Sequence, residues 1–246
     1  MKTISAERGY IIPAIGQQYV DCAEYLRKSI LKWNTRANVV VLTKDMLPFG
    51  DQGGFANDWQ VFYASPFKQT IKLEADMFAA SSIDHYWNIF QHKDVVVSVG
   101  ARDFYDKPVT ARHYRRFIDQ NSLPDVYNAI TYWRLSETAK TFFDTVKAIF
   151  QNWSEFKKLV KYAEDSPSTD FVYAMAAQIL GPERVTLPPG IGPTIVHMKR
   201  YCVPIETEDW TRELIWEHTD PGLRIHTMAQ WGLVHYHIKE WVNECR

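Results

Sequence analysis

Two carboxylates stand at the end of a short apolar run. The segment TIKL, residues 70–73, leads directly into Glu74 and Asp76, which are one residue apart. Alternate side chains of an extended chain point the same way, so both carboxylates can face one point. Two like charges at that spacing repel unless a cation lies between them. Mg²⁺ typically binds one or two carboxylates together with substrate phosphates. The pair therefore indicates a divalent-cation site, with a solvated acidic turn as the alternative.

Strand and helix patterns alternate around this pair, which is typical of an α/β sheet. In open α/β sheets, ligands bind beyond the carboxyl ends of the strands, where Glu74 and Asp76 stand. Apolar runs with little polar alternation indicate buried parallel strands, and apolar residues at helical spacing indicate covering helices. We expect strands at residues 9–16, 37–43, 70–73, 94–100, 127–134 and 194–198, and helices at 17–33, 81–90, 136–153 and 168–180.

The C-terminal part has a different pattern. From Leu223 onward, apolar residues recur at helical spacing and predict a closing helix, through Met228, Trp231, His235, Ile238 and Val242. His235 would lie on the apolar face of this helix and His237 off it, which is the wrong arrangement for chelation by a helix. Both are therefore interpreted as structural. The chain is expected to form one compact domain with a smaller C-terminal addition.

Composition limits the class of protein. The 246 residues are 46% hydrophobic and carry a formal net charge of −1, with a pI of about 6.7, so a globally basic nucleic-acid binder is not indicated. Three widely spaced cysteines argue against a disulfide scaffold and favour a reducing compartment. The first residues do not form a signal peptide, and no stretch reaches the roughly 18 apolar residues of a membrane helix. We expect a cytoplasmic protein without a membrane partner.

The surroundings of the acidic pair resemble a known family. Asp76 is followed by Met77 and Phe78, and then by Ile83-Asp84. An acid-x-Asp-Met element at the end of an apolar strand, with Ile-Asp shortly after it, resembles the metal-binding element of the GT-A glycosyltransferases. The resemblance is strongest to nucleotide-sugar transferases of the glycogenin and galactosyltransferase type. Here the first acid is Glu74, whereas the family has Asp.

Other stretches resemble the same family in the same order. GYIIPAIG to VVVLT is similar to its opening β-α-β unit, and VYNAITYWRLSETAKTFF to its Asn-containing strand and next helix. TDFVYAMAAQILG stands where the family has a helix with an Asp-Gln pair, of which only the Asp is present here. PTIVHMKR resembles the late strand that ends on a metal-binding histidine. The resemblance implies a GT-A, Rossmann-like α/β fold, with a central mostly parallel sheet flanked by helices. It implies a nucleotide-sugar-binding catalytic domain at residues 1–200 and a small helical extension at 201–246.

The resemblance also implies a donor and a cation. The donor would be a nucleotide-diphosphate sugar, taken here as UDP-linked, and the cation Mn²⁺ or Mg²⁺. Asp76 and His197 would be metal ligands, and Glu74 the third ligand or a contact to the ribose. Lys72 and Lys199 would contact the phosphates.

The remaining site residues follow from the same resemblance. Ala14 and Tyr19 would line the pocket for the nucleobase, because the family places the base against its first strand and turn. Asn128 and Asp170 would face the transferred sugar or the acceptor. Asp170 would act as a base or stabilise the cationic sugar of the transition state.

One basic and aromatic stretch bears on the acceptor. Cations alternate with aromatic residues between Arg102 and Arg116, which is the combination that contacts phosphates and stacks on bases. It indicates a hydroxymethylated base in DNA as one acceptor, in which case the chain would be encoded by a bacteriophage and act in the host cytoplasm. A saccharide or small-molecule acceptor is the other. A non-catalytic binding module on the same fold is a further alternative.

Overall fold

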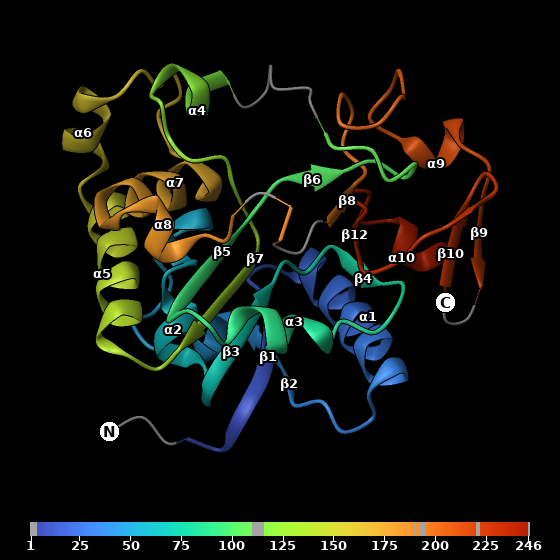
Figure 1. The fold of residues 1–246 in the computed structure, drawn as a ribbon, viewed down its shortest axis with the longest axis horizontal. Helices are drawn as coiled ribbons and strands as arrows, with labels where there is room; N and C mark the ends of the chain where they lie inside the picture. Colours follow the sequence, from blue (N-terminus) through green and yellow to red (C-terminus); the bar gives the residue numbers. More distant parts are fainter. Residues whose placement is uncertain (1–3, 110–115, 189, 192–194, 220–221, 246) are drawn as a thin grey trace.

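The computed structural model describes residues 4–109, 116–188, 190–191, 195–219 and 222–245. A five-stranded sheet in the order β2-β1-β3-β7-β5 forms its centre (Figure 1). Four of these strands are parallel and β7 is antiparallel to both neighbours. The strands are β1 (Ala6–Ala14), β2 (Val39–Thr43), β3 (Phe67–Leu73), β5 (Val95–Val99) and β7 (Val126–Arg134). The α/β fold expected from the sequence is confirmed.

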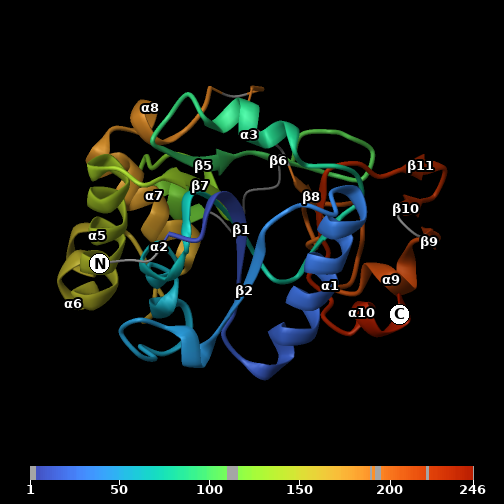
Figure 2. The same ribbon diagram turned by 90° about the horizontal axis from the view of Figure 1, so that it is seen from below.

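Helices cover both faces of this sheet. Figure 2 shows α1 (Gln17–Trp33) on one side and α5 (Glu137–Gln151) with α7 (Thr169–Leu180) on the other. Smaller helical segments connect the elements: η1 (Lys44–Met46), η2 (Gly54–Asn57), α2 (Gln60–Ala64), α3 (His85–Phe90), α4 (Arg116–Gln120), α6 (Trp153–Phe156), η4 (Lys157–Leu159) and α8 (Pro182–Val185).

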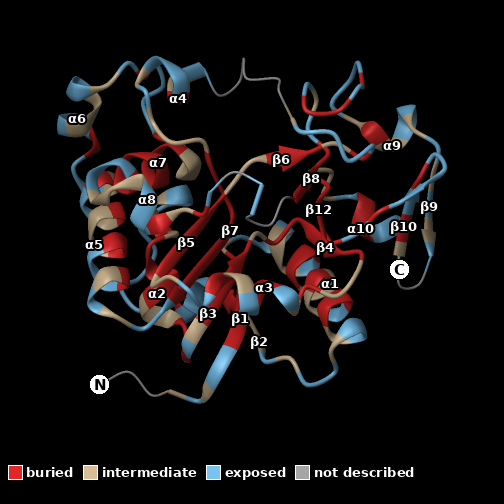
Figure 3. Cartoon of the chain, viewed as in Figure 1, coloured by how far each residue is buried: buried red, intermediate tan, exposed pale blue. Residues whose placement is uncertain are grey.

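Each face of the sheet has its own hydrophobic core. In β1, Tyr10 and Ile12 pack into the core that contains α1, whereas Ile11 packs into the core that contains α5 and α7. This alternation follows from the two-residue period of a strand. Because both faces are covered, the central strands are buried along most of their length (Figure 3).

The helix α5 has the cap and the apolar periodicity from which the sequence predicts a helix. Ser136 caps it by accepting a hydrogen bond from the backbone N–H of Ala139 at 3.2 Å. Its buried residues follow the helical period along one stripe, which faces the sheet: Ala139, Phe142, Phe143, Val146 and Ile149.

A second sheet lies beyond the first and contains chain segments that are far apart in sequence. Its order is β4-β12-β8-β6, formed by β4 (Met77–Ala79), β12 (Leu233–His235), β8 (Ile195–His197) and β6 (Ala101–Arg102). Strand β12 is antiparallel to β4 and parallel to β8. The C-terminal segment is therefore inserted between two elements of the preceding domain.

The prediction of a closing helix from Leu223 onward is wrong. Within the described residues 222–245, this region contains β10 (Gly222–Ile225), β11 (Met228–Ala229) and β12, and a single short helix, α10 (Trp241–Glu244). Strands β10 and β11 form a small sheet with β9 (Trp216–Thr219), next to α9 (Trp210–Glu213). Gly232 interrupts the pattern with a φ of 68°, a conformation that glycine adopts readily and a helix does not contain. Pairing with β4 and β8 then fixes residues 233–235 as a strand.

We predict that Phe143→Ala lowers the free energy of unfolding by about 3–5 kcal/mol, because it empties a closely packed aromatic site. Phe143 is fully buried, stacks on Phe62 at 5.1 Å between ring centres and meets Trp133 edge-on at 4.9 Å. Urea denaturation measures the change. Leu159→Ala is the control, since Leu159 is 79% exposed and should lose less than about 0.5 kcal/mol. Equal losses in the two variants would contradict the packing described here.

Candidate metal and nucleotide site

The two acids stand in the short link between β3 and β4. The backbone N–H of Glu74 donates to the carbonyl of Ala129 on β7 at 3.2 Å, and the carbonyl of Asp76 accepts from the N–H of Tyr236 at 3.2 Å. Ala75 between them is buried. The link is therefore held by the central sheet at one end and by the C-terminal segment at the other.

His235, at the end of β12, contacts both acids. Its Nε2 lies 3.1 Å from Oδ1 of Asp76 and 3.4 Å from Oε2 of Glu74. Lys239 adds a second cation, with Nζ 3.6 Å from Oδ2 of Asp76. The helical placement expected for His235 is therefore wrong: the residue ends a strand and lies against the acidic pair.

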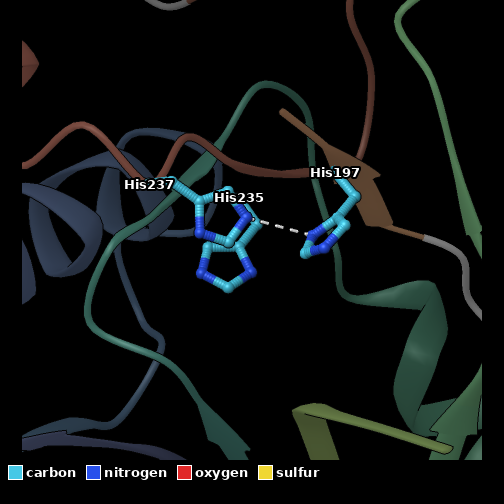
Figure 4. Close-up of side chains that lie close together, drawn as sticks. All are labelled: His197, His235 and His237. Carbon is cyan, nitrogen blue, oxygen red and sulfur yellow. Dashed lines mark hydrogen bonds between the residues drawn. The ribbon is translucent and has the colours of Figure 1, made fainter. Parts of the chain in front are cut away.

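His197 and His237 lie beside His235. Residues 197 and 235 are register partners of β8 and β12. Nε2 of His237 lies 3.1 Å from Nδ1 of His197, and the rings of His235 and His237 stack with 3.8 Å between their centres. Figure 4 shows the three rings turned toward one another. His237, interpreted from the sequence as structural, is thus also part of this cluster.

Burial and neighbouring charges change the protonation of these groups. Burial lowers the pKa of His235, but the charge and hydrogen bond of Asp76, together with the charge of Glu74, outweigh it, so the pKa is raised above its usual value. Burial would raise the pKa of Asp76, but His235 holds it below its usual range. Burial raises the pKa of Glu74, with His235 and Lys72 opposing the shift.

His237 behaves in the opposite way to His235. Burial, together with repulsion from His235 and His197, holds the pKa of His237 well below its usual value. A neutral imidazole is the form that binds metals. His237 is therefore in its ligating form at neutral pH.

The described residues offer two groups of metal-ligating atoms. Glu74, Asp76 and His235 form one, and His197, His235 and His237 form the other. Within each group, the ligand atoms all lie within 4.8 Å of one another. Carboxylate oxygens suit Mg²⁺ and Mn²⁺, and imidazole is also a ligand of transition metals. The first group fits the divalent cation expected from the sequence, with His235 in the position expected for His197.

A cavity of about 530 Å³ opens next to both groups. Of the residues expected at the site, seven line it: Tyr19, Lys72, Glu74, Asp76, Asp170, His197 and Lys199. Ala14 is buried and does not belong to the described lining, which includes its neighbours Pro13 and Ile15 instead. Leu42 and Leu47 extend this apolar part of the wall.

Lys72 is buried and has an acidic partner that the sequence did not reveal. Its side chain is 1% exposed, with Nζ 2.9 Å from Oδ1 of Asp58 and 3.2 Å from the carbonyl of Asn128. The hydroxyl of Tyr173 donates to Asp58 as well. Asp58 lines the cavity, but a single acid in a loop gives no spacing signal by which it could have been predicted.

Asp170 and Asn128 are joined, but only one of them lines the cavity. Asp170 stands in the first turn of α7 and accepts a hydrogen bond from the backbone N–H of Asn128 at 2.7 Å. The side chain of Asn128 is fully buried; it donates to Asp58 at 3.2 Å and accepts from Thr131 at 3.0 Å. Asn128 therefore supports Asp58 and Asp170 from behind and does not belong to the described lining of the cavity.

The basic and aromatic stretch is partly used inside the fold. Arg102 is buried, stacks on the ring of Trp231 at 3.8 Å and pairs with Asp106 at 3.1 Å. Arg116 is exposed at the start of α4. Residues 110–115 lie outside the described part of the chain.

Among the described helices, none has the length and apolar character required to cross a bilayer.

Comparison with known proteins matches the chain to solved structures alone. No protein-family model matches it, and neither does the sequence of any curated protein. A glycosyltransferase involved in the glycosylation of the major capsid of PBCV-1 is 6% identical, with a TM-score of 0.50 and 97% of each chain covered.

Two other glycosyltransferases match less of the structure. The bifunctional glycosyltransferase WbbM is 12% identical, with a TM-score of 0.46 and 76% of this chain covered against 39% of its own. The galactosyltransferase LgtC, solved with donor and acceptor sugar analogues, is 12% identical, with a TM-score of 0.43 and 72% of each chain covered. The chain spans less than half the length of WbbM and of GlyE from Streptococcus pneumoniae TIGR4.

With its central mostly parallel sheet and the match to the PBCV-1 protein over 97% of each chain, the chain has the fold of the GT-A glycosyltransferases.

Proposed function

We propose that the chain is a metal-dependent glycosyltransferase that moves a sugar from a nucleotide-diphosphate sugar, UDP-linked, to an acceptor. The observation that carries this proposal is the group Glu74, Asp76 and His235, which lines a cavity at the carboxyl end of β3. Ligands of open α/β sheets bind at such ends. The fold shared with the PBCV-1 glycosyltransferase supports the same reaction class.

The cavity has an apolar and a charged part, which suits the two ends of a nucleotide-diphosphate sugar. Pro13, Ile15 and Leu42 would contact the nucleobase, and Tyr19 would stack on it or on the ribose. Lys199, at the charged end, would contact the phosphates. Lys72 is held by Asp58, so we propose that it contributes its charge from below the surface.

The acids and His235 would hold Mn²⁺ or Mg²⁺. When bound, the cation would neutralise the charge that develops on the diphosphate leaving group. The chain's own part is to hold Glu74 and Asp76 rigidly from both ends of their link, through Ala129 and Tyr236. Such preorganisation removes the cost of moving the ligands during the reaction.

Asp170 would act at the transferred sugar. It lines the cavity, and its hydrogen bond from the N–H of Asn128 fixes the direction of the carboxylate. A carboxylate in this position can accept a proton from the acceptor hydroxyl or stabilise the positive charge on the sugar. Asn128 lies behind the cavity wall and holds both Asp170 and Asp58, which also lines the cavity.

For the acceptor we favour a saccharide or small molecule over a modified base in phage DNA. The basic stretch that suggested DNA begins with Arg102, whose guanidinium is engaged with Trp231 and Asp106. It cannot reach a phosphate without leaving the core. Transfer assays with oligosaccharides and with hydroxymethylated DNA distinguish the two acceptors, and metal-dependent turnover of the donor separates either from a non-catalytic binding module.

We predict that UDP binds only weakly without Mn²⁺, and that Asp76→Asn weakens Mn²⁺-dependent UDP binding at least about tenfold, or 1.4 kcal/mol. The amide keeps the size of the side chain but loses its charge. Calorimetric titration of UDP with and without Mn²⁺ measures both effects. Asp165→Asn, at a fully exposed acid, is the control. Equal affinity with and without metal, and in the variant, would refute the assignment of this cation site.

We predict that Asp170→Asn lowers the turnover of a UDP-sugar by about 10²–10⁴-fold, the usual contribution of an acid–base group. UDP affinity should change little, since the amide oxygen can still accept from Asn128. Release of UDP is the measurement. Glu137→Gln is the matched control, because Glu137 is an exposed acid in the first turn of α5. Undiminished turnover would exclude Asp170 from the chemistry.

We predict that Mn²⁺ affinity rises with pH above 6.5. His235 has a pKa raised above that value in the metal-free protein, and a cation binds only the unprotonated imidazole. The same shift stabilises the metal-free fold below pH 6.5, and this stabilisation is lost as the pH rises through the folded pKa. Calorimetry across this range measures the affinity. Constant affinity from pH 6 to 9 would show that His235 is not a ligand.

A further inference from the structure

The three histidines at the ends of β8 and β12 form a donor set that contains no carboxylate. Nδ1 of His197 and Nε2 of His237 lie 3.1 Å apart. Together with one nitrogen of His235, these atoms lie within 4.8 Å of one another. In Figure 4, His197 faces the stacked pair His235 and His237 from the opposite side. The proposed sugar transfer uses only His235 of this set.

The spacing of the nitrogens suits a metal ion. Two nitrogens bound to one tetrahedral Zn²⁺ at about 2.0–2.1 Å lie roughly 3.3 Å apart, close to the separation of the His197 and His237 atoms. A hydrogen bond between two imidazoles has a similar length, so this distance alone does not identify a metal site.

A second observation points to a missing ligand. His235 is 6% exposed, and its Nδ1 has no hydrogen-bond partner among the described residues. A buried polar nitrogen without a partner is costly. His237, next to it, has a φ of 61°, a left-handed conformation that is unfavourable for a residue with a side chain. The chain thus bears two local costs within this cluster, and a cation bound to Nδ1 of His235 would remove the first of them.

The donor type selects the kind of cation. Neutral imidazoles bind late transition metals such as Zn²⁺, Co²⁺ and Ni²⁺, whereas Mg²⁺ prefers carboxylate, carbonyl and water oxygens. The imidazole group and the group of Glu74, Asp76 and His235 therefore prefer different ions. Because His235 belongs to both groups, and two dications so close together repel each other, an ion at one group opposes an ion at the other.

We propose that His197, His235 and His237 form a binding site for a late transition-metal ion, such as Zn²⁺, that competes with the Mn²⁺ or Mg²⁺ held by the acids. The site requires neither a nucleotide nor transferase activity. Its consequence for the proposed transferase is that Zn²⁺ displaces Mn²⁺ by taking His235.

Titration of the metal-free protein with Co²⁺, followed by visible absorption, tests the site directly. We expect a bound Co²⁺ with the absorption of nitrogen ligands, which Zn²⁺ displaces. His237→Asn and His197→Asn should each weaken Co²⁺ binding at least about tenfold. His226→Asn is the matched control, since His226 is an exposed histidine that is also left-handed, with a φ of 51°. Circular dichroism verifies that each variant is folded.

The reciprocal variant separates the two groups of ligands. Asp76→Asn should abolish Mn²⁺ binding and leave Co²⁺ affinity within about threefold of the wild-type value. In the wild-type protein, Zn²⁺ should release bound Mn²⁺, which electron paramagnetic resonance detects as free ion, and His237→Asn should require about tenfold more Zn²⁺ for the same release.

Two results would overturn the inference. Unchanged Co²⁺ affinity in both histidine variants would show that the rings are joined by hydrogen bonds alone. Loss of Co²⁺ and Mn²⁺ binding together in Asp76→Asn would show a single mixed site. If UDP binding proves independent of metal while Co²⁺ still requires His237, the transferase proposal fails and the imidazole site stands.

Discussion

The rest of the site depends on two like charges that lie close together and are partly buried. Glu74 and Asp76 leave the end of β3 with side chains that are 28% and 11% exposed, and an unbalanced pair of carboxylates in this position would be destabilising. Positive groups from the C-terminal segment, His235 and Lys239, supply the balance. The strand of residues 233–235, inserted between β4 and β8, brings these positive groups to the acids. The C-terminal part of the chain therefore balances the negative charge of Glu74 and Asp76, in addition to packing against the first part of the chain.

A second charge pair, Lys72 and Asp58, follows the same principle. Lys72 is directed into the protein from β3 and is almost completely buried, so it needs a negative partner, and Asp58 provides it. Asp58 is in turn held by Tyr173 and Asn128. Removing one member of a buried ion pair typically costs about 3–5 kcal/mol. The loop that carries Asp58 is therefore tied to the central sheet, and the cavity wall that it forms is fixed before any ligand arrives.

The sequence predicted those parts of the fold in which one element carries enough residues to show a period. Strands β1 and β7 and helices α1 and α5 span 9, 9, 17 and 15 residues, and all of them were expected. Strands β4, β8 and β12 have three residues each, too few for a period of two to be seen. Of these only β8 was expected, from the short apolar run at residues 194–198. The acids were found because their spacing is local. Asp58 was missed because its partner is distant in the sequence. His237 was missed because the neighbouring apolar residues recur every three or four positions, as in a helix, and His237 would lie off the apolar face of such a helix.

The position of His235 changes how the acidic pair should be understood. Glu74 replaces the shorter acid of the family that the sequence resembles, and its carboxylate comes within 3.4 Å of Nε2 of His235, which also lies 3.1 Å from Asp76. A longer side chain at position 74 can thus reach a histidine that comes from β12, whereas the histidine expected from the sequence, His197, faces His237. The replacement and the inserted strand are then two parts of one arrangement. Because β12 also brings the imidazoles together, the geometry that balances the acids is the same geometry that creates a competing set of nitrogen ligands.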